Sequence, residues 1–380
     1  MYQASSAFHQ AVANGAPQRA LLLFADAVFT NEDIDVDAGI EMDDYFNTEE
    51  DIAIGQALSN EIRFSIFNDS RLLNDYEFGD FTATIGARIQ TNTYTASESA
   101  RVVTPVTTYV AYASQPYLIR NGVTAPSQPN FRIVSFLARD GKVYAFGKNG
   151  QYMVLKDSDG SNITSSNPVN QFMRNKFKNM GGIGTCYNNR MYEIWDNGRY
   201  EKYECVPLGS FIAKRPNVPD VNVITFTCHD HMTDFDADMP SKEELMLTYP
   251  STISNLFERI CEYAGVAYAT STFINSAAVI TKEPDEFSTA TMREVMQWIA
   301  EAAAANLRFN RDGILTFDWI RDTDTELSET EYIEFSPYWY ETTQIDKLYN
   351  RSSESGSDLT VGEGETGYLI QDNPLLKGVT

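Results

Sequence analysis

The clearest candidates for metal-ligating or catalytic chemistry are two histidines that precede a run of acidic residues. His229 and His231 would share one face of a strand, because side chains alternate along it, and imidazole suits a transition metal. Asp234, Asp236 and Asp238 follow within a few residues. A metal site needs a third ligand at a suitable spacing, and none of these aspartates provides one. We therefore interpret the segment as a strand end that runs into an acidic turn, which caps or solvates itself.

Other motifs of this kind are incomplete. A calcium loop that started at Asp234 would place Met239 where the sharp turn needs glycine. Cys228 and His229 are adjacent, so on a strand they point to opposite faces and cannot pair as nucleophile and base. The glycines at 181–184 lack the Lys-Ser/Thr of a phosphate-binding loop. We therefore predict no catalytic, cofactor-binding or metal-binding residue and no cofactor, and we expect a protein that is not an enzyme.

The charge of the chain is strongly acidic and unevenly distributed. The 380 residues carry a formal net charge of −24, from 53 acidic and 29 basic residues. Stable nucleic-acid binding needs lysine and arginine to displace phosphate counterions, so this balance disfavours a DNA-binding module. An acidic wall would instead repel DNA and let it pass without stable binding. The acidity is densest at 20–62, which contains no lysine or arginine, and the candidate residues for such a wall are Asp33, Asp35, Asp37, Glu41, Asp43 and Asp44.

A basic segment interrupts this acidic framework. Residues 130–178 contain eight basic and three acidic residues, a net charge of +5 in a chain that is −29 elsewhere. This contrast indicates a separately folded insertion that docks onto an acidic neighbour or projects toward a host envelope. Its candidate docking residues are Arg174, Lys176 and Lys178.

The elements that would position these residues are mainly strands. Alternating runs predict an antiparallel meander or barrel in the first hundred residues, after a short helix that ends near Gly15. Asp140-Gly141 and an Asn-Gly at 149–150 predict hairpin turns in a later meander. Helical spacing predicts a helix from Ile253 to a stop at Gly265, and Thr291 with Glu294 can form the capping box of another helix. The fold class is therefore mainly β with a small α+β domain.

Aromatic residues and cysteines add less specific signals. Tyr338, Trp339 and Tyr340 form a cluster that could stack on sugars, but we predict that it packs at a domain or subunit interface. The four cysteines have no CxxC spacing and are expected to be buried free thiols in a reducing compartment. The first residues do not resemble a signal peptide, and no apolar run is long enough for a membrane span, so we expect synthesis in a cytoplasm.

Four stretches, in this order, resemble the hub proteins of phage tails. This family includes the baseplate hub of contractile phages and the N-terminal region of tail-associated lysozymes in siphophages. Together the stretches cover about half of the chain. They are IGQALSNEIRFSIFN at 54–68, PLGSFIAKRP at 207–216 with ITFTCHDHMTDFD at 224–236, YPSTISNLFERICEYAGV at 249–266, and FSTATMREVMQWIAEAAAANLRFNRDGILTF at 287–317.

The resemblance implies a virion structural protein of the tail tip or baseplate, assembled in the cytoplasm of a host bacterium. It implies a homotrimer with a split tube-like β-barrel whose lumen the acidic residues line or flank. Its partners would be a distal tail or tail tube protein and a spike, fibre or other baseplate protein, with roles in host attachment and DNA ejection. The implied domains are a first barrel part at 1–100, an inserted β-meander at 101–200, a return to the barrel at 201–240, the α+β domain at 241–325, and a return β segment with a flexible loop at 326–380.

Two departures and two alternatives accompany this prediction. The insertion at 101–200 is absent from the simplest family members, and the chain stops at Thr380 where many relatives continue. One alternative is a carbohydrate-binding adhesin at the tail tip that uses the aromatic residues of the meander. The other is a glycan hydrolase that uses paired carboxylates, because 53 acidic residues offer many pairs.

Overall fold

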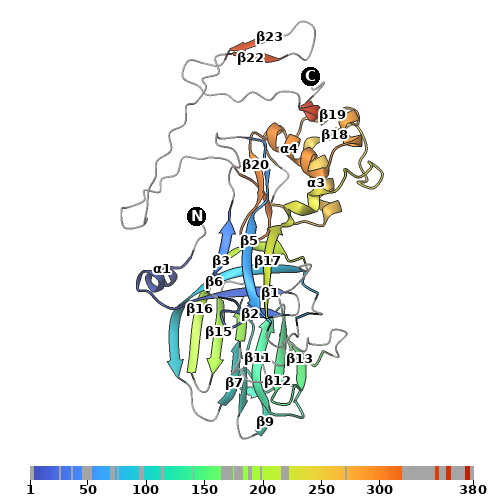
Figure 1. Ribbon diagram of the computed structural model, residues 1–380. Coiled ribbons are helices and arrows are strands. Elements are labelled where there is room, and N and C mark those ends of the chain that lie inside the picture. Colours follow the sequence, from blue (N-terminus) through green and yellow to red (C-terminus); the bar gives the residue numbers. More distant parts are fainter. Residues whose placement is uncertain are drawn as a thin grey trace. The chain divides into compact units, whose positions relative to one another are not determined.

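The computed structural model describes most of the chain and divides it into two compact units (Figure 1). The described residues are 4–24, 27–35, 37–44, 54–68, 73–74, 77–93, 98–112, 115–139, 141–163, 174, 183–186, 191–196, 199–214, 222–269, 272–318, 347–350, 357–360 and 373–376. The first unit comprises Met1–Glu41 and Ile62–Cys228, and the second comprises Met42–Glu61 and His229–Thr380. Strands predominate, so the prediction of a mainly β chain is confirmed.

A large sheet forms the framework of the first unit. Twelve strands belong to it, in the order β13-β12-β11-β14-β15-β16-β17-β5-β3, with β6 branching from β16 and leading to β1 and β2. The described strands do not close into a barrel. Their bounds are β1 Gln18–Phe24, β2 Val28–Thr30, β3 Ile40–Asp43, β5 Glu61–Phe67, β6 Asp80–Thr93, β11 Ile133–Arg139, β12 Lys142–Gly147, β13 Tyr152–Lys156, β14 Ile183–Cys186, β15 Met191–Asp196, β16 Arg199–Ile212 and β17 Val223–Asp230.

Two long strands hold the centre of this unit together. β6 pairs antiparallel with β16 over almost its whole length and with β1 on its other edge. Alternating apolar residues of these strands point into one core, in which Phe81 stacks on Phe24 with the ring centroids 4.7 Å apart. Burial of such rings is the main source of stability for a sheet of this kind.

The predicted meander forms a second small core within the first unit. A four-stranded sheet, in the order β10-β9-β8-β7, contributes residues such as Tyr109 and Leu118, and β11, β12 and β13 contribute residues such as Phe136 and Val143. The hairpin turns are confirmed, because β12 pairs antiparallel with both β11 and β13. The boundaries proposed for an independent domain at 101–200 stay a prediction. The bounds are β7 Glu98–Val103, β8 Thr108–Tyr112, β9 Gln115–Arg120 and β10 Val123–Thr124.

The second unit is a small α+β core built around two amphipathic helices. α3 (Ile253–Ala264) begins at the N-cap Thr252 and ends at Gly265, whose φ of 71° suits a left-handed C-cap. α4 (Met292–Ala302) begins with the predicted capping box, in which Thr291 and Glu294 each accept the other's backbone N–H. Both helix predictions are confirmed.

Short strands and 3-10 turns complete this core. β20 pairs antiparallel with β21 and parallel with β4, which precedes it by some 250 residues in the sequence. The side chain of Asn373 donates to the carbonyl of Trp298, so the segment at 373–376 also packs on α4. The bounds are β4 Ala57–Leu58, β18 Ser251–Thr252, β19 Val279–Ile280, β20 Asn306–Phe309, β21 Leu315–Asp318, β22 Lys347–Asn350, β23 Ser357–Thr360, η2 His231–Asp236, η3 Asp285–Ser288 and η4 Pro374–Leu376.

One further helix, α1 (Ser6–Ala13), belongs to the first unit and confirms the helix expected before Gly15. Among the described residues, no helix has the length and apolar character that a membrane crossing requires.

Candidate functional site

The predicted acidic residues lie around the turn that leads from β2 to β3, and several of them have local bonding partners. The carboxylate of Asp33 accepts the backbone N–H of Thr30 at 2.8 Å, and that of Asp35 accepts the N–H of Asp37 at 3.2 Å. These bonds shape the turn, as short acidic side chains commonly do. Asp37 itself is exposed.

The remaining acidic candidates lie on or beside β3. Glu41 faces Arg63 at 3.7 Å, and both side chains are largely exposed. In the second unit, Asp44 accepts from the guanidinium of Arg308 at 2.8 Å. These arginines compensate part of the negative charge that the sequence concentrates here. A role of the segment in lining a lumen stays a prediction.

The other predicted site residues are only partly described. The guanidinium carbon of Arg174 lies 4.6 Å from the ring centroid of Tyr152, a cation–π contact. Lys176 and Lys178 lie outside the described residues, as do Tyr338, Trp339 and Tyr340.

The segment with two histidines has the structure expected of a self-capping turn. β17 ends at Asp230, whose carboxylate accepts the N–H of Met232 and caps η2. His231 contacts Asp234 at 2.8 Å, whereas His229 faces Glu61 at 3.7 Å, so the two imidazoles have different carboxylate partners. Within the described ranges, no three potential ligands among His, Cys, Asp and Glu cluster closely enough for a metal ion.

Asp230 also connects separate segments of the second unit by hydrogen bonds. Its buried carboxylate accepts the backbone N–H of Asn60 at 2.9 Å and the hydroxyl of Ser59 at 3.0 Å. Asn60 in turn donates to the carbonyl of Phe309. Burial raises the pKa of Asp230, although these hydrogen bonds and the charge of Arg293 act in the opposite direction. The carboxylate therefore joins the end of β17 to the residues that follow β4, and the side chain of Asn60 extends this connection to β20.

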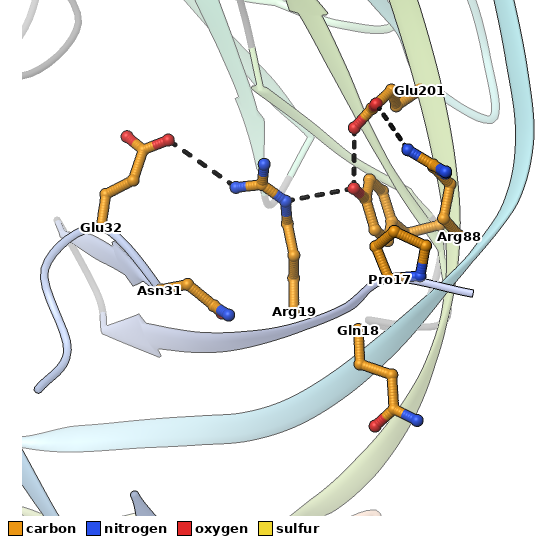
Figure 2. A pocket seen from close by; sticks show the side chains of 8 residues that line it. Pro17, Gln18, Arg19, Asn31, Glu32, Arg88 and Glu201 are labelled. Atoms are coloured by element: carbon orange, nitrogen blue, oxygen red, sulfur yellow. Dashed lines mark hydrogen bonds and ion pairs between the residues drawn. The ribbon is translucent and has the colours of Figure 1, made fainter. Parts of the chain in front are cut away.

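A pocket in the first unit brings together residues that the sequence interpretation did not select. It has a volume of about 410 Å³, and β1, the turn after β2, β6 and β16 all contribute to it (Figure 2). Figure 2 shows the guanidinium of Arg19 between Glu32 on one side and Glu201 and Arg88 on the other.

The groups in this pocket form one continuous network. Arg19 Nε donates to Tyr203 Oη at 3.1 Å, and Tyr203 Oη donates to Glu201 Oε2 at 2.7 Å. The other oxygen of Glu201 accepts from Arg88 at 3.0 Å and contacts Arg199 at 3.1 Å. Glu32 lies farther from Arg19, at 3.7 Å.

The electrostatics of the network hold Glu201 ionised and Tyr203 protonated. Burial alone would raise the pKa of Glu201, but the hydrogen bonds from Tyr203 and Arg88 and the charges of Arg88 and Arg199 outweigh it and lower the pKa. Burial, and then the hydrogen bond to Glu201, raises the pKa of Tyr203. A tyrosine held protonated is poorly suited as a general base near neutral pH. The arrangement instead joins β1, β6 and β16 through charge-assisted hydrogen bonds.

One signal in the sequence could have revealed part of this network. Arg199, Glu201 and Tyr203 alternate along β16, so their side chains share one face of the strand. The positions of Arg19 and Arg88 depend on the pairing of β1 and β6, which local patterns do not specify. No family model, no curated protein and no solved structure matches the chain.

Proposed function

We propose that this chain is a structural hub protein of a phage tail tip or baseplate. In this proposal three copies form a ring that closes the distal end of a tail tube. The ring contacts a distal tail or tube protein on one side and a spike, fibre or other baseplate protein on the other. The chain is not an enzyme, and it acts in the virion by connecting parts and by letting DNA pass during ejection.

The observation that carries the proposal is the open sheet of the first unit. The described strands end at β2, β3 and β13 and do not close on themselves, although residues 161–163 pair with part of the outer edge of β13. An exposed sheet edge is a template for pairing with another chain, and proteins that act alone usually cover or shorten it. A tube-like wall could be completed by neighbouring copies at these edges.

The distribution of charge agrees with the same function. β3 forms one edge and carries Glu41 and Asp43, next to the turn that contains Asp33, Asp35 and Asp37. An acidic surface at the lumen would keep a DNA duplex from adhering, because both carry negative charge. The basic residues of the meander would contact an acidic neighbour or the host envelope.

Negative-stain electron microscopy of the purified chain tests the proposal. We expect rings with threefold symmetry and a central opening wide enough for a DNA duplex. Isolated particles of single-chain size at every protein concentration would contradict it.

A further inference from the structure

The network around the pocket of the first unit carries an excess of positive charge, although the chain as a whole is acidic. It contains three guanidinium groups, those of Arg19, Arg88 and Arg199, and two carboxylates, those of Glu32 and Glu201. One positive charge is therefore in excess, in a chain whose net charge is −24. Salt screens the more distant acidic residues, so at short range this surface attracts an anion.

The two carboxylates of the network are held with very different strength. Glu201 accepts from Tyr203 at 2.7 Å and from Arg88 at 3.0 Å, and it is 14% exposed. Glu32 lies 3.7 Å from Arg19, which is longer than a hydrogen bond, and it is 61% exposed. An exposed ion pair of this length contributes little to stability. Glu32 can therefore move away from Arg19 at little cost, and a second carboxylate can take its place.

Two donors line the pocket on the side where this replacement would occur. Figure 2 shows Asn31 and Glu32 on the same side of Arg19. The side-chain oxygen of Asn31 accepts the backbone N–H of Ala20, so the NH2 group is the end of this amide that can donate to a ligand. The guanidinium of Arg19 presents its N–H groups in one plane, a geometry that matches the two oxygens of a carboxylate.

The volume and the charge of the pocket favour one class of ligand. A volume of about 410 Å³ lies in the range of small-molecule sites and leaves room for more than a bare ion. A carboxylate brings one negative charge, which balances the excess of the network. A phosphate group carries more negative charge and would be repelled by Glu201 and Glu32. A neutral ligand would leave the positive charge uncompensated.

We propose that this pocket binds the carboxylate group of an external ligand, which accepts hydrogen bonds from Arg19 and Asn31 in place of the Glu32 contact. The inference goes beyond the proposed assembly function and does not depend on it. The carboxylate belongs either to a small molecule or to an acidic side chain of a partner protein, since both present the same group.

Titration of the full-length chain with two carboxylate probes tests the proposal. The probes are acetate and a Gly-Glu-Gly tripeptide with blocked termini, followed by saturation-transfer NMR at constant ionic strength, with inorganic phosphate as a competitor. We expect both probes to bind saturably and to compete, and phosphate to displace acetate less well than either. Tripeptide that binds at least tenfold more tightly than acetate would assign the group to a protein side chain, and equal affinity would assign it to small carboxylates. Absence of saturable binding, or stronger competition by phosphate, would overturn the proposal.

Three variants give changes of different sign. Arg19→Gln should weaken acetate binding about tenfold or more, because it removes a charged donor. Glu32→Gln should strengthen binding severalfold, because it removes the competing carboxylate. The matched control is Glu41→Gln, since Glu41 faces Arg63 at the same 3.7 Å outside the pocket, and its affinity should stay within about twofold of the wild type.

The strengthening in Glu32→Gln separates a binding role from a folding defect, because a poorly folded variant could only lose binding. Equal affinities of Glu32→Gln and Glu41→Gln would show that the change in net charge alone matters. That result, or unchanged binding in Arg19→Gln, would overturn the proposal.

Discussion

Asp230 and Glu201 are two poorly exposed carboxylates, one in each unit, and their surroundings shift their pKa values in opposite directions. Asp230 accepts hydrogen bonds from uncharged groups, namely two backbone N–H groups and the hydroxyl of Ser59. Glu201 accepts from the tyrosine hydroxyl and from the guanidinium of Arg88, and it also contacts Arg199. Burial raises the pKa of Asp230, whereas charged partners lower the pKa of Glu201 despite burial.

The hydrogen-bonding partners of a carboxylate therefore determine its role as much as its burial does. In the second unit, Asp230 accepts hydrogen bonds from separate segments of the backbone, and its burial carries a desolvation cost. In the first unit the carboxylate neutralises arginines from two strands and gains from their charge. Loss of the Asp230 carboxylate should mainly leave backbone N–H donors unsatisfied. Loss of the Glu201 carboxylate should mainly leave arginine side chains without their ion-pair partner.

The largest effect is expected for Asp230→Ala. The substitution would leave the buried N–H groups of Asn60 and Met232 without their acceptor, and each such loss costs about 1–3 kcal/mol. We expect the free energy of unfolding to fall by about 3 kcal/mol. Urea denaturation followed by circular dichroism measures it, because α3 and α4 contribute helical signal. Asp238→Ala, at an exposed aspartate near the same turn, is the control, and an equal loss in both variants would refute the role of Asp230.

A smaller effect is expected for Glu201→Gln. The amide keeps the size of the side chain but removes the charge that Arg88 and Arg199 face, with a cost of about 1–2 kcal/mol. The matched control is Glu32→Gln, because Glu32 is 61% exposed and lies 3.7 Å from Arg19. That pair should contribute less than about 0.5 kcal/mol. Thermal denaturation of both variants gives the comparison, and equal destabilisation would show that the network does not depend on Glu201.

The smallest and most specific effect is the pH dependence of what Asp230 and Glu201 contribute to the free energy of unfolding. Because the folded pKa of Asp230 is raised above its ordinary value of 3.8, its contribution to stability is greatest below that pH and decreases as the pH rises through the folded pKa. Because the folded pKa of Glu201 is lowered from 4.5, its contribution is present above that pH and is lost as the pH falls through the folded pKa.

Urea midpoints between pH 3 and pH 7 test these signs with Asp230→Asn and Glu201→Gln. The wild type should gain relative to Asp230→Asn as the pH falls and gain relative to Glu201→Gln as the pH rises. Differences that change in the same direction would contradict the opposite pKa shifts.

Local sequence patterns predict some of the contacts of Asp230 and Glu201 but not others. The strand end at Asp230 and its capping turn follow from local spacing, as do the hairpin of β11 and β12 and the capping box at Thr291. These features depend on neighbours a few residues apart. The bonds from Asp230 to Ser59 and Asn60 span 171 and 170 residues of sequence, and Arg88 lies 113 residues from Glu201.

The contacts that local patterns do not predict depend on pairing between strands that are distant in the sequence. The pocket forms only once the register of β1, β6 and β16 is set, and single residues such as Arg19 carry no signal of that register. In the same way, an alternating pattern predicts strands but not whether their sheet closes within one chain. That the described sheet ends at β2, β3 and β13 without closing is therefore a property that only its pairing reveals.

The mass of the purified chain in solution tests the central claim most directly, because a hub must assemble from several copies. Multi-angle light scattering at near-physiological salt, over a hundredfold range of concentration, is the appropriate measurement. The account predicts a species of three times the 42.7 kDa of one chain. A mass of 42.7 kDa that does not change across the range would contradict it.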